Sequence, residues 1–154
     1  MSKEVSIDTV KLNRLMDKVR GVPDKLFRKK TMKVIGLIHK NRIFLRTLSG
    51  KDTEGNKFKP YSANYALSAK KLSVNNVNLS LTGMMLKGMN TTATDNSARI
   101  FFSTDENNDL AAKHENGDGV PKRSFFGISD EDSENIFKDY SKVTNKLLKK
   151  AGFE

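Results

Sequence analysis

The residues best suited to chemistry are His114 and Glu115, which are adjacent in a short polar segment. A His-Glu pair opens the zinc-binding pattern His-Glu-x-x-His, in which two histidines bind the metal and the glutamate acts as a general base. Asp118 holds the position of the second histidine, and the preceding Gly117 would end a helix there. The pair therefore does not predict zinc hydrolysis, and we expect His114 to cap or pack a short helix.

Acidic runs at 105–109 and 130–134 offer oxygen ligands for a hard cation. Calcium loops space such ligands around a turn, whereas consecutive carboxylates at the start of a helix are explained by the helix dipole. The other histidine, His39, is expected to be a solvated or partly packed surface residue. The phosphate-binding loop and the nucleophile elbow are also missing from the sequence. We therefore expect no catalytic residue, metal or cofactor, and predict that the protein is not an enzyme.

One short segment interleaves basic and aromatic residues, namely Lys57, Phe58, Lys59 and Tyr61. Proteins that bind single-stranded nucleic acid combine these types, because bases stack on aromatic rings while lysines contact phosphates. A loop that is anchored by Phe58 and Tyr61 explains the same pattern and is the stronger interpretation. We treat these four residues as a candidate assembly-contact loop.

Composition and charge limit the classes of protein to consider. The 154 residues are 36% hydrophobic and 30% charged, which is typical of one soluble domain with a modest core. Without cysteine the chain has no disulfides, and no apolar run approaches the roughly 20 residues that cross a bilayer. The net charge of +10 is uneven, with +9 in residues 1–50 and −3 in residues 101–154. This asymmetry fits nucleic-acid contact, complementary surfaces between copies, or simple solubility.

Hydrophobic periodicity predicts two helices in the first third of the chain. The first spans about 8–20, and the second begins after Pro23 and ends near Leu48. On a helical wheel the second has an apolar side, made of Leu26, Phe27, Val34, Ile35, Leu37, Ile38, Leu45 and Leu48. Its opposite, outer face is basic and consists of Lys25, Arg28, Lys29, Lys33, Lys40 and Arg46.

Shorter elements follow in the rest of the chain. Ser62 can cap a helix that runs to Lys71 with Tyr65 and Leu67 packed, and a one- or two-turn helix can form within 80–89. A β-hairpin is predicted over 89–94 and 99–103, followed by a helix from Asn108 or Asp109 to Gly117 and a possible third strand at 124–128. Ser129 caps the final helix, whose buried stripe is Ile136, Phe137, Tyr140, Val143, Leu147 and Leu148.

These elements predict an α+β fold, in which a small, mainly antiparallel β-sheet packs with a long basic amphipathic helix and a C-terminal helix. Residues 1–154 are expected to form a single domain, with a core over 23–150. The helix within 1–22 can be peripheral to that core.

Five segments stand in a characteristic order: Arg42-Ile-Phe-Leu-Arg46, Asp52-Thr-Glu-Gly55-Asn-Lys-Phe58-Lys-Pro60-Tyr-Ser, Leu81-Thr-Gly83-Met-Met-Leu, Leu110-Ala-Ala-Lys-His114-Glu-Asn-Gly117 and Arg123-Ser-Phe-Phe-Gly127-Ile-Ser-Asp130. In this order they resemble the virion-morphogenesis or tail-completion proteins of tailed bacteriophages. The chain departs from the family pattern at Leu110, where an aromatic residue is usual, and at Lys122, where a proline often stands. The resemblance covers roughly 25–145.

The resemblance implies a structural protein of the virion neck or upper tail, assembled in the cytoplasm of the bacterial host. Such a protein completes the tail and joins it to the head as a member of an oligomeric ring, together with other neck and tail proteins. No catalytic residues carry over. The basic helix face would then meet a neighbouring subunit or the DNA that passes through the lumen.

Two other functions remain open from the residues themselves. The basic front third also fits a free, sequence-independent nucleic-acid-binding protein, whose affinity would fall steeply with salt. A small metal-dependent hydrolase around His114 and Glu115 is the weakest reading.

Overall fold

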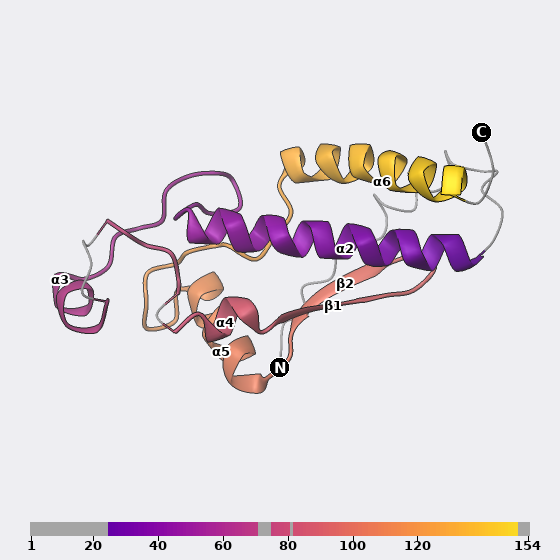
Figure 1. Ribbon diagram of the computed structural model, residues 1–154. Coiled ribbons are helices and arrows are strands. Elements are labelled where there is room, and N and C mark those ends of the chain that lie inside the picture. Colours follow the sequence, from indigo (N-terminus) through magenta and orange to yellow (C-terminus); the bar gives the residue numbers. More distant parts are fainter. Residues whose placement is uncertain (1–24, 71–74, 81, 151–154) are drawn as a thin grey trace. The chain divides into compact units, whose positions relative to one another are not determined.

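The structure is a computed structural model that describes residues 25–70, 75–80 and 82–150 (Figure 1). Its elements are α2 (Lys25–Leu48), α3 (Ala63–Tyr65), the π-helical turn η1 (Ala66–Lys70), α4 (Met84–Lys87), β1 (Met89–Ala93), β2 (Ala98–Phe102), α5 (Asp105–Asn116) and α6 (Asp130–Lys150). The helices and the two-stranded antiparallel sheet confirm the predicted α+β class, with a long helix and a C-terminal helix. The helix expected at 8–20 lies outside the described residues.

The chain divides into two compact units. In the described ranges, unit 1 comprises 41–70, 75–80, 82–90 and 101–127, and unit 2 comprises 25–40, 91–100 and 128–150. The helix α2 and the hairpin each contribute residues to both units. The single domain that the sequence suggests stays a prediction.

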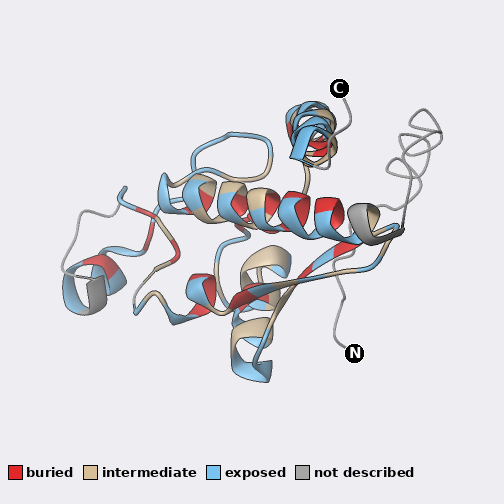
Figure 2. Ribbon diagram, turned by 45° about the vertical axis from the view of Figure 1, so that its right-hand side comes forward, coloured by how far each residue is buried: buried red, intermediate tan, exposed pale blue. Residues whose placement is uncertain are grey.

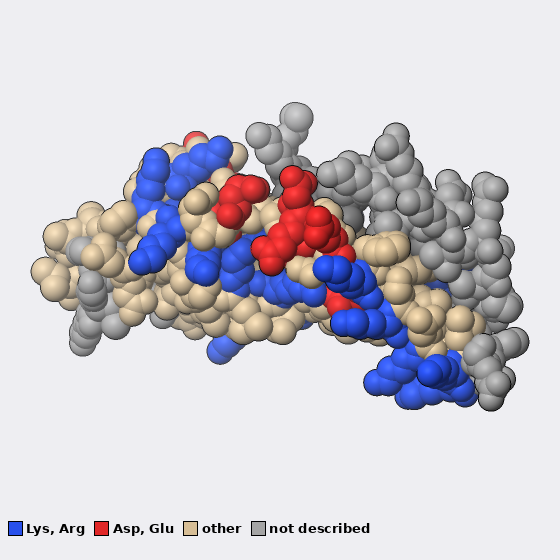
Figure 3. Space-filling model, turned by 90° about the horizontal axis from the view of Figure 1, so that it is seen from above, with Lys and Arg blue, Asp and Glu red and all other residues tan. Residues whose placement is uncertain are grey.

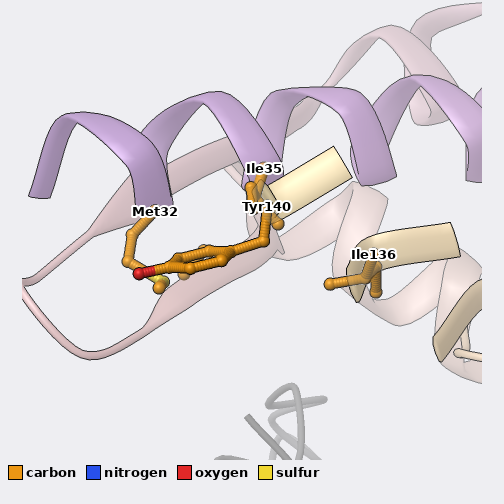
Figure 4. Packing of buried hydrophobic residues seen from close by; sticks show 5 residues of the cluster. Met32, Ile35, Ile136 and Tyr140 are labelled. Carbon is orange, nitrogen blue, oxygen red and sulfur yellow. The ribbon is translucent and has the colours of Figure 1, made fainter. Parts of the chain in front are cut away.

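The core of unit 2 forms between α2, the hairpin and α6. Figure 4 shows the ring of Tyr140 beside Met32, with Ile35 and Ile136 nearby. Ala98 completes this buried cluster, and Ala93 and Ile128 pack against it. The burial of these apolar side chains attaches α6 to the first half of α2.

The buried side of α2 differs from the predicted apolar side. Ile35 is buried as predicted, but Val34, Leu37, Leu45 and Leu48 are between 37% and 56% exposed. The rest of the buried row is Thr31, Met32, His39, Ile43 and Thr47. Figure 2 shows this burial recurring turn by turn along the helix. His39 is 1% exposed, so the prediction of a surface histidine was wrong. Gly36 lets α2 approach the hairpin closely, and a hydrophobicity count detects neither that glycine nor the buried polar side chains.

Gly36 marks the closest approach of α2 to the hairpin in unit 2. A Cβ at this position would clash with Cγ2 of Thr91 and would lie 3.1 Å from Cβ of Ala98. The threonine cannot rotate freely away, because β-branched side chains have few rotamers.

Gly36→Ala is therefore expected to destabilise unit 2 by about 2 kcal/mol, even though alanine favours a helix. Adding Thr91→Ser removes the clashing methyl group and should recover most of the loss. Denaturant unfolding followed by circular dichroism measures both variants. A stabilised Gly36→Ala single variant would contradict this close approach.

The caps of the later helices explain where those helices begin. Oγ1 of Thr104 accepts a hydrogen bond from the Asn107 amide at 3.3 Å, so α5 starts earlier than the predicted Asn108 or Asp109. It ends at Gly117, as predicted, where φ is 82°. Ser129 and Asp132 exchange side-chain and backbone hydrogen bonds of 3.0 and 3.1 Å, which confirms the predicted cap of α6.

Some predictions of packing and pairing were wrong. Phe137 is 40% exposed and Leu67 is 73% exposed, so neither packs as expected, whereas Ile136 and Tyr140 are buried as predicted. The third strand at 124–128 does not form, and the described part of the chain has a sheet of two strands.

No helix in the described ranges is long and apolar enough to cross a membrane.

Candidate functional site

Three side chains in unit 1 bind the main chain of segments that are far apart in the sequence. They are Arg46 at the end of α2, Glu115 in α5 and Arg123 in the segment after α5. We call this group the unit 1 network. It fixes the 123–127 segment and the 52–61 loop, two parts of unit 1 that lie outside its helices and strands.

Glu115 satisfies the backbone of two consecutive phenylalanines. One of its carboxylate oxygens, Oε1, accepts hydrogen bonds from the amides of Phe125 at 2.6 Å and Phe126 at 2.7 Å. Burial raises the pKa of Glu115, although these two amides, Lys122 and Arg46 act in the opposite direction. In a β-strand these consecutive amides would point to opposite edges, whereas here both donate to the same oxygen.

Arg46 satisfies the carbonyl groups of the same segment. Its Nη2 donates to the carbonyl oxygens of Phe125 at 3.1 Å and Gly127 at 3.0 Å. The sequence predicted Arg46 on the outer basic face of the helix. This prediction was wrong, because the guanidinium binds the main chain within unit 1. Together, Arg46 and Glu115 account for the missing third strand, because side chains take up the backbone groups that strand pairing would use.

Arg123 holds the 52–61 loop. Its Nε and Nη2 each donate at 2.9 Å, to the carbonyl oxygens of Lys59 and Pro60, and its guanidinium lies 4.9 Å from the ring centre of Tyr61. Arg123 is only 3% exposed, and this burial lowers its pKa. A buried arginine with two carbonyl partners and an aromatic face is a strong positional constraint.

The 52–61 loop is also held from within and by Ser124. Oδ1 of Asp52 accepts from the amides of Glu54 and Asn56, and the amide of Thr53 donates to the Ser124 carbonyl at 2.8 Å. Phe58 and Tyr61 are 7% and 9% exposed, and Tyr61 accepts a hydrogen bond from the Leu79 amide. The anchored loop predicted from Phe58 and Tyr61 is confirmed.

His114 lies next to the unit 1 network and packs in α5, as predicted. Burial, followed by the nearby positive charge of Arg123, lowers its pKa from 6.5 to about 4. Its buried Nδ1 has no hydrogen-bond partner among the residues that the structure describes. The imidazole is therefore neutral near pH 7, and protonation at lower pH would put a second cation beside Arg123.

Acid should consequently weaken unit 1 through His114. Because its pKa is lower in the folded chain, the stability that this group contributes is complete above pH 6.5 and is lost as the pH falls toward 4. After discounting for partial solvation, we expect a loss of about 1 to 2 kcal/mol. His114→Gln should lose less stability over this range in unfolding curves at matched pH values. Equal pH dependence in both proteins would contradict the assignment.

The predicted contact residues occupy different environments. Lys29 and Lys33 are exposed on α2, Arg28 and Lys40 are half-buried, and the side chain of Lys25 lies outside the described residues. In the candidate assembly-contact loop, Lys57 and Lys59 are exposed whereas Phe58 and Tyr61 point inward. The loop therefore presents its lysines, and the aromatic rings support them.

No cluster of His, Asp or Glu side chains in the described ranges is arranged to hold a metal ion. The sequence predicted a capping or packing role for His114 but gave no indication of the partners of Glu115 and Arg46. The sequence nevertheless marks where these residues lie. Glu115 is two residues before Gly117, which ends α5, and Arg123 is two residues before the Phe125-Phe126 pair.

No family profile, curated protein or solved structure matches the chain.

Proposed function

We propose that the protein is a structural component of a phage virion, which completes the tail and joins it to the head at the neck as part of a ring. The observation that carries the proposal is the grouping of the ordered segments that resemble tail-completion proteins. Four of the five segments, those containing Arg46, Lys59, Glu115 and Arg123, meet in or around the unit 1 network. In these segments Arg46, Glu115 and Arg123 hold the main chain in place. A shared structural role would explain why the segments occur together in one sequence.

The proposal places the protein in the neck or upper tail, after assembly in the host cytoplasm. Its partners are further copies of itself, other neck and tail proteins, and the DNA that crosses the lumen. The unit 1 network has the properties of a scaffold: Arg123 binds the main chain of Lys59 and Pro60, in a loop whose Lys57 and Lys59 side chains are exposed. A fixed loop loses little conformational entropy on docking, which favours assembly.

The direct test combines the purified protein with phage tails that lack their completion protein. Negative-stain images should show added density at the head-proximal end of the tail, and tails so treated should join to filled heads. Lys57→Glu/Lys59→Glu should reduce this binding, whereas Lys87→Glu/Lys113→Glu changes the same charge on exposed sites elsewhere in unit 1 and should not. Failure of the wild-type protein to associate with tails or heads would refute the proposal.

A second candidate function is sequence-independent binding to nucleic acid. Lys29, Lys30 and Lys33 are exposed within little more than one turn of α2 and form a basic surface in unit 2. Phosphate contacts of this kind produce affinity that falls steeply with salt. Fluorescence anisotropy with labelled duplex DNA should reveal that slope, and Lys29→Glu/Lys33→Glu should flatten it. Absence of binding at low salt would exclude this function.

A further inference from the structure

We propose that one surface of unit 1 docks onto the exposed face of α6 in a second copy of this chain. The first surface, which we call the basic tip, consists of Lys57, Lys59, Tyr65 and Leu67. The second, the α6 face, consists of Glu131, Glu134 and Phe137. This inference rests on the proposed function, since it specifies the contact between neighbouring copies of the ring.

The basic tip combines exposed apolar surface with positive charge. Leu67 is 73% exposed and Tyr65 is 37% exposed, although both are large hydrophobic residues. The ring of Tyr65 lies 5.0 Å from that of Tyr61, which Arg123 in turn contacts, so the tip is attached to the unit 1 network. Residues 57–70 contain three lysines and no acidic residue. Such a surface is suited to an apolar partner with acidic surroundings.

The α6 face has the opposite character. Phe137 is 40% exposed on a helix whose neighbouring Ile136 and Tyr140 are buried in the core of unit 2. Glu134 and Glu131 are exposed one and two turns before it, respectively, and residues 130–139 contain five acidic residues and one lysine. Figure 3 shows acidic side chains gathered over the beginning of α6 and basic side chains over its end.

Charge complementarity selects a second copy as the occupant. Each surface joins an exposed apolar side chain to charges that the other lacks, so the apolar residues can meet while lysines approach carboxylates. The two surfaces are different, and a contact between them is therefore heterologous. In an open row of subunits, heterologous contacts leave a free basic tip at one end and a free α6 face at the other. If the rotation between neighbours brings these two ends together, the row closes into a ring.

A charge-exchange experiment tests the pairing in the full-length protein. Lys57→Glu/Lys59→Glu makes the tip acidic, and Glu131→Lys/Glu134→Lys makes the α6 face basic. Each variant alone should associate at least about tenfold more weakly than wild type in multi-angle light scattering, because like charges then face each other. Mixing the two variants should restore association, since each then offers the complement of the other. Lys87→Glu/Lys113→Glu, on exposed sites outside the tip, should associate as wild type does.

Cysteine crosslinking gives a second, geometric readout, because the natural chain has no cysteine. Leu67→Cys and Phe137→Cys proteins, when mixed and treated with a short bis-maleimide, should yield a covalent dimer that neither protein forms alone. Dimers from Phe137→Cys alone would indicate that α6 pairs with itself, and this outcome would overturn the proposal. An unrestored mixture of the charge variants would overturn it as well.

The two proposals fail in different ways. If copies do not pair through these surfaces but the protein still binds to tails, the docking proposal is wrong and the proposed function stands. If the charge-exchanged mixture assembles but the wild-type protein binds to neither tails nor heads, the surfaces pair while the proposed function is refuted. The pairing and tail-binding measurements use the same charge variants. One circular dichroism spectrum of each variant therefore shows whether a folding defect affects either measurement.

Discussion

Glu115→Ala is expected to lower the free energy of unfolding of unit 1 by about 3 kcal/mol, because it leaves two amides without an acceptor. The amides of Phe125 and Phe126 belong to residues that are 0% and 8% exposed, so water cannot readily replace the carboxylate. Hydrogen exchange should show the effect first at these two amides. Denaturant unfolding should show it as a lower transition midpoint.

Two substitutions separate the acceptor from its charge. Glu115→Gln keeps an oxygen that can accept both hydrogen bonds without a negative charge, and should cost about 1 kcal/mol. Asp109→Ala removes an exposed carboxylate from the same helix and should change stability by less than about 0.5 kcal/mol. If exchange at Phe125 and Phe126 were unchanged in Glu115→Ala, the carboxylate would not be their acceptor in solution.

The regular elements were predictable because their signals are local. Ser129 with Asp132 specifies the start of α6, Gly117 specifies the end of α5, and the Thr-rich and aromatic runs around a short turn specify the hairpin. Each of these signals acts within a few residues of the chain. Local hydrogen bonds and dihedral preferences are sufficient to explain them.

The irregular part of unit 1 was not predictable in the same way. Phe125 and Phe126 have the composition of a strand, yet their amides bind Glu115, which stands ten and eleven residues earlier. Arg46 contacts carbonyl groups 79 and 81 residues away. A pattern of hydrophobicity contains no information about such partners, so the sequence alone predicted a third strand.

The same limitation explains the error in the orientation of α2. A hydrophobicity wheel favours Leu37 and Leu45 for the buried side, but the chain buries Thr31, His39 and Thr47 there. Oγ1 of Thr47 donates to the Ile43 carbonyl at 2.7 Å, which satisfies the hydroxyl inside the helix itself. A polar residue that is internally bonded can be buried at little cost, and the wheel counts it as a surface residue.

Arg123→Ala should have the largest effect of any substitution in the 52–61 loop and its supports, with a loss of about 4 kcal/mol. The change removes both hydrogen bonds to Lys59 and Pro60 and the cation above the ring of Tyr61. It also leaves the carbonyl groups of Lys59 and Pro60 without these two donors. Unfolding should therefore begin at the loop, with faster exchange at the Leu79 amide, whose acceptor is Tyr61.

Arg123→Lys distinguishes the geometry of the guanidinium from its charge. Lysine keeps the positive charge beside Tyr61 but cannot donate from two fixed nitrogens to two carbonyls, so about half of the loss should remain. Lys122→Ala, at the exposed neighbouring position, should be nearly neutral. If lysine at 123 restored full stability, charge alone would support the loop. If the stability of Arg123→Lys instead lay between those of Arg123→Ala and wild type, the basic tip would depend on the hydrogen bonds to the two carbonyls. Docking between copies should then weaken in parallel with the stability of the loop.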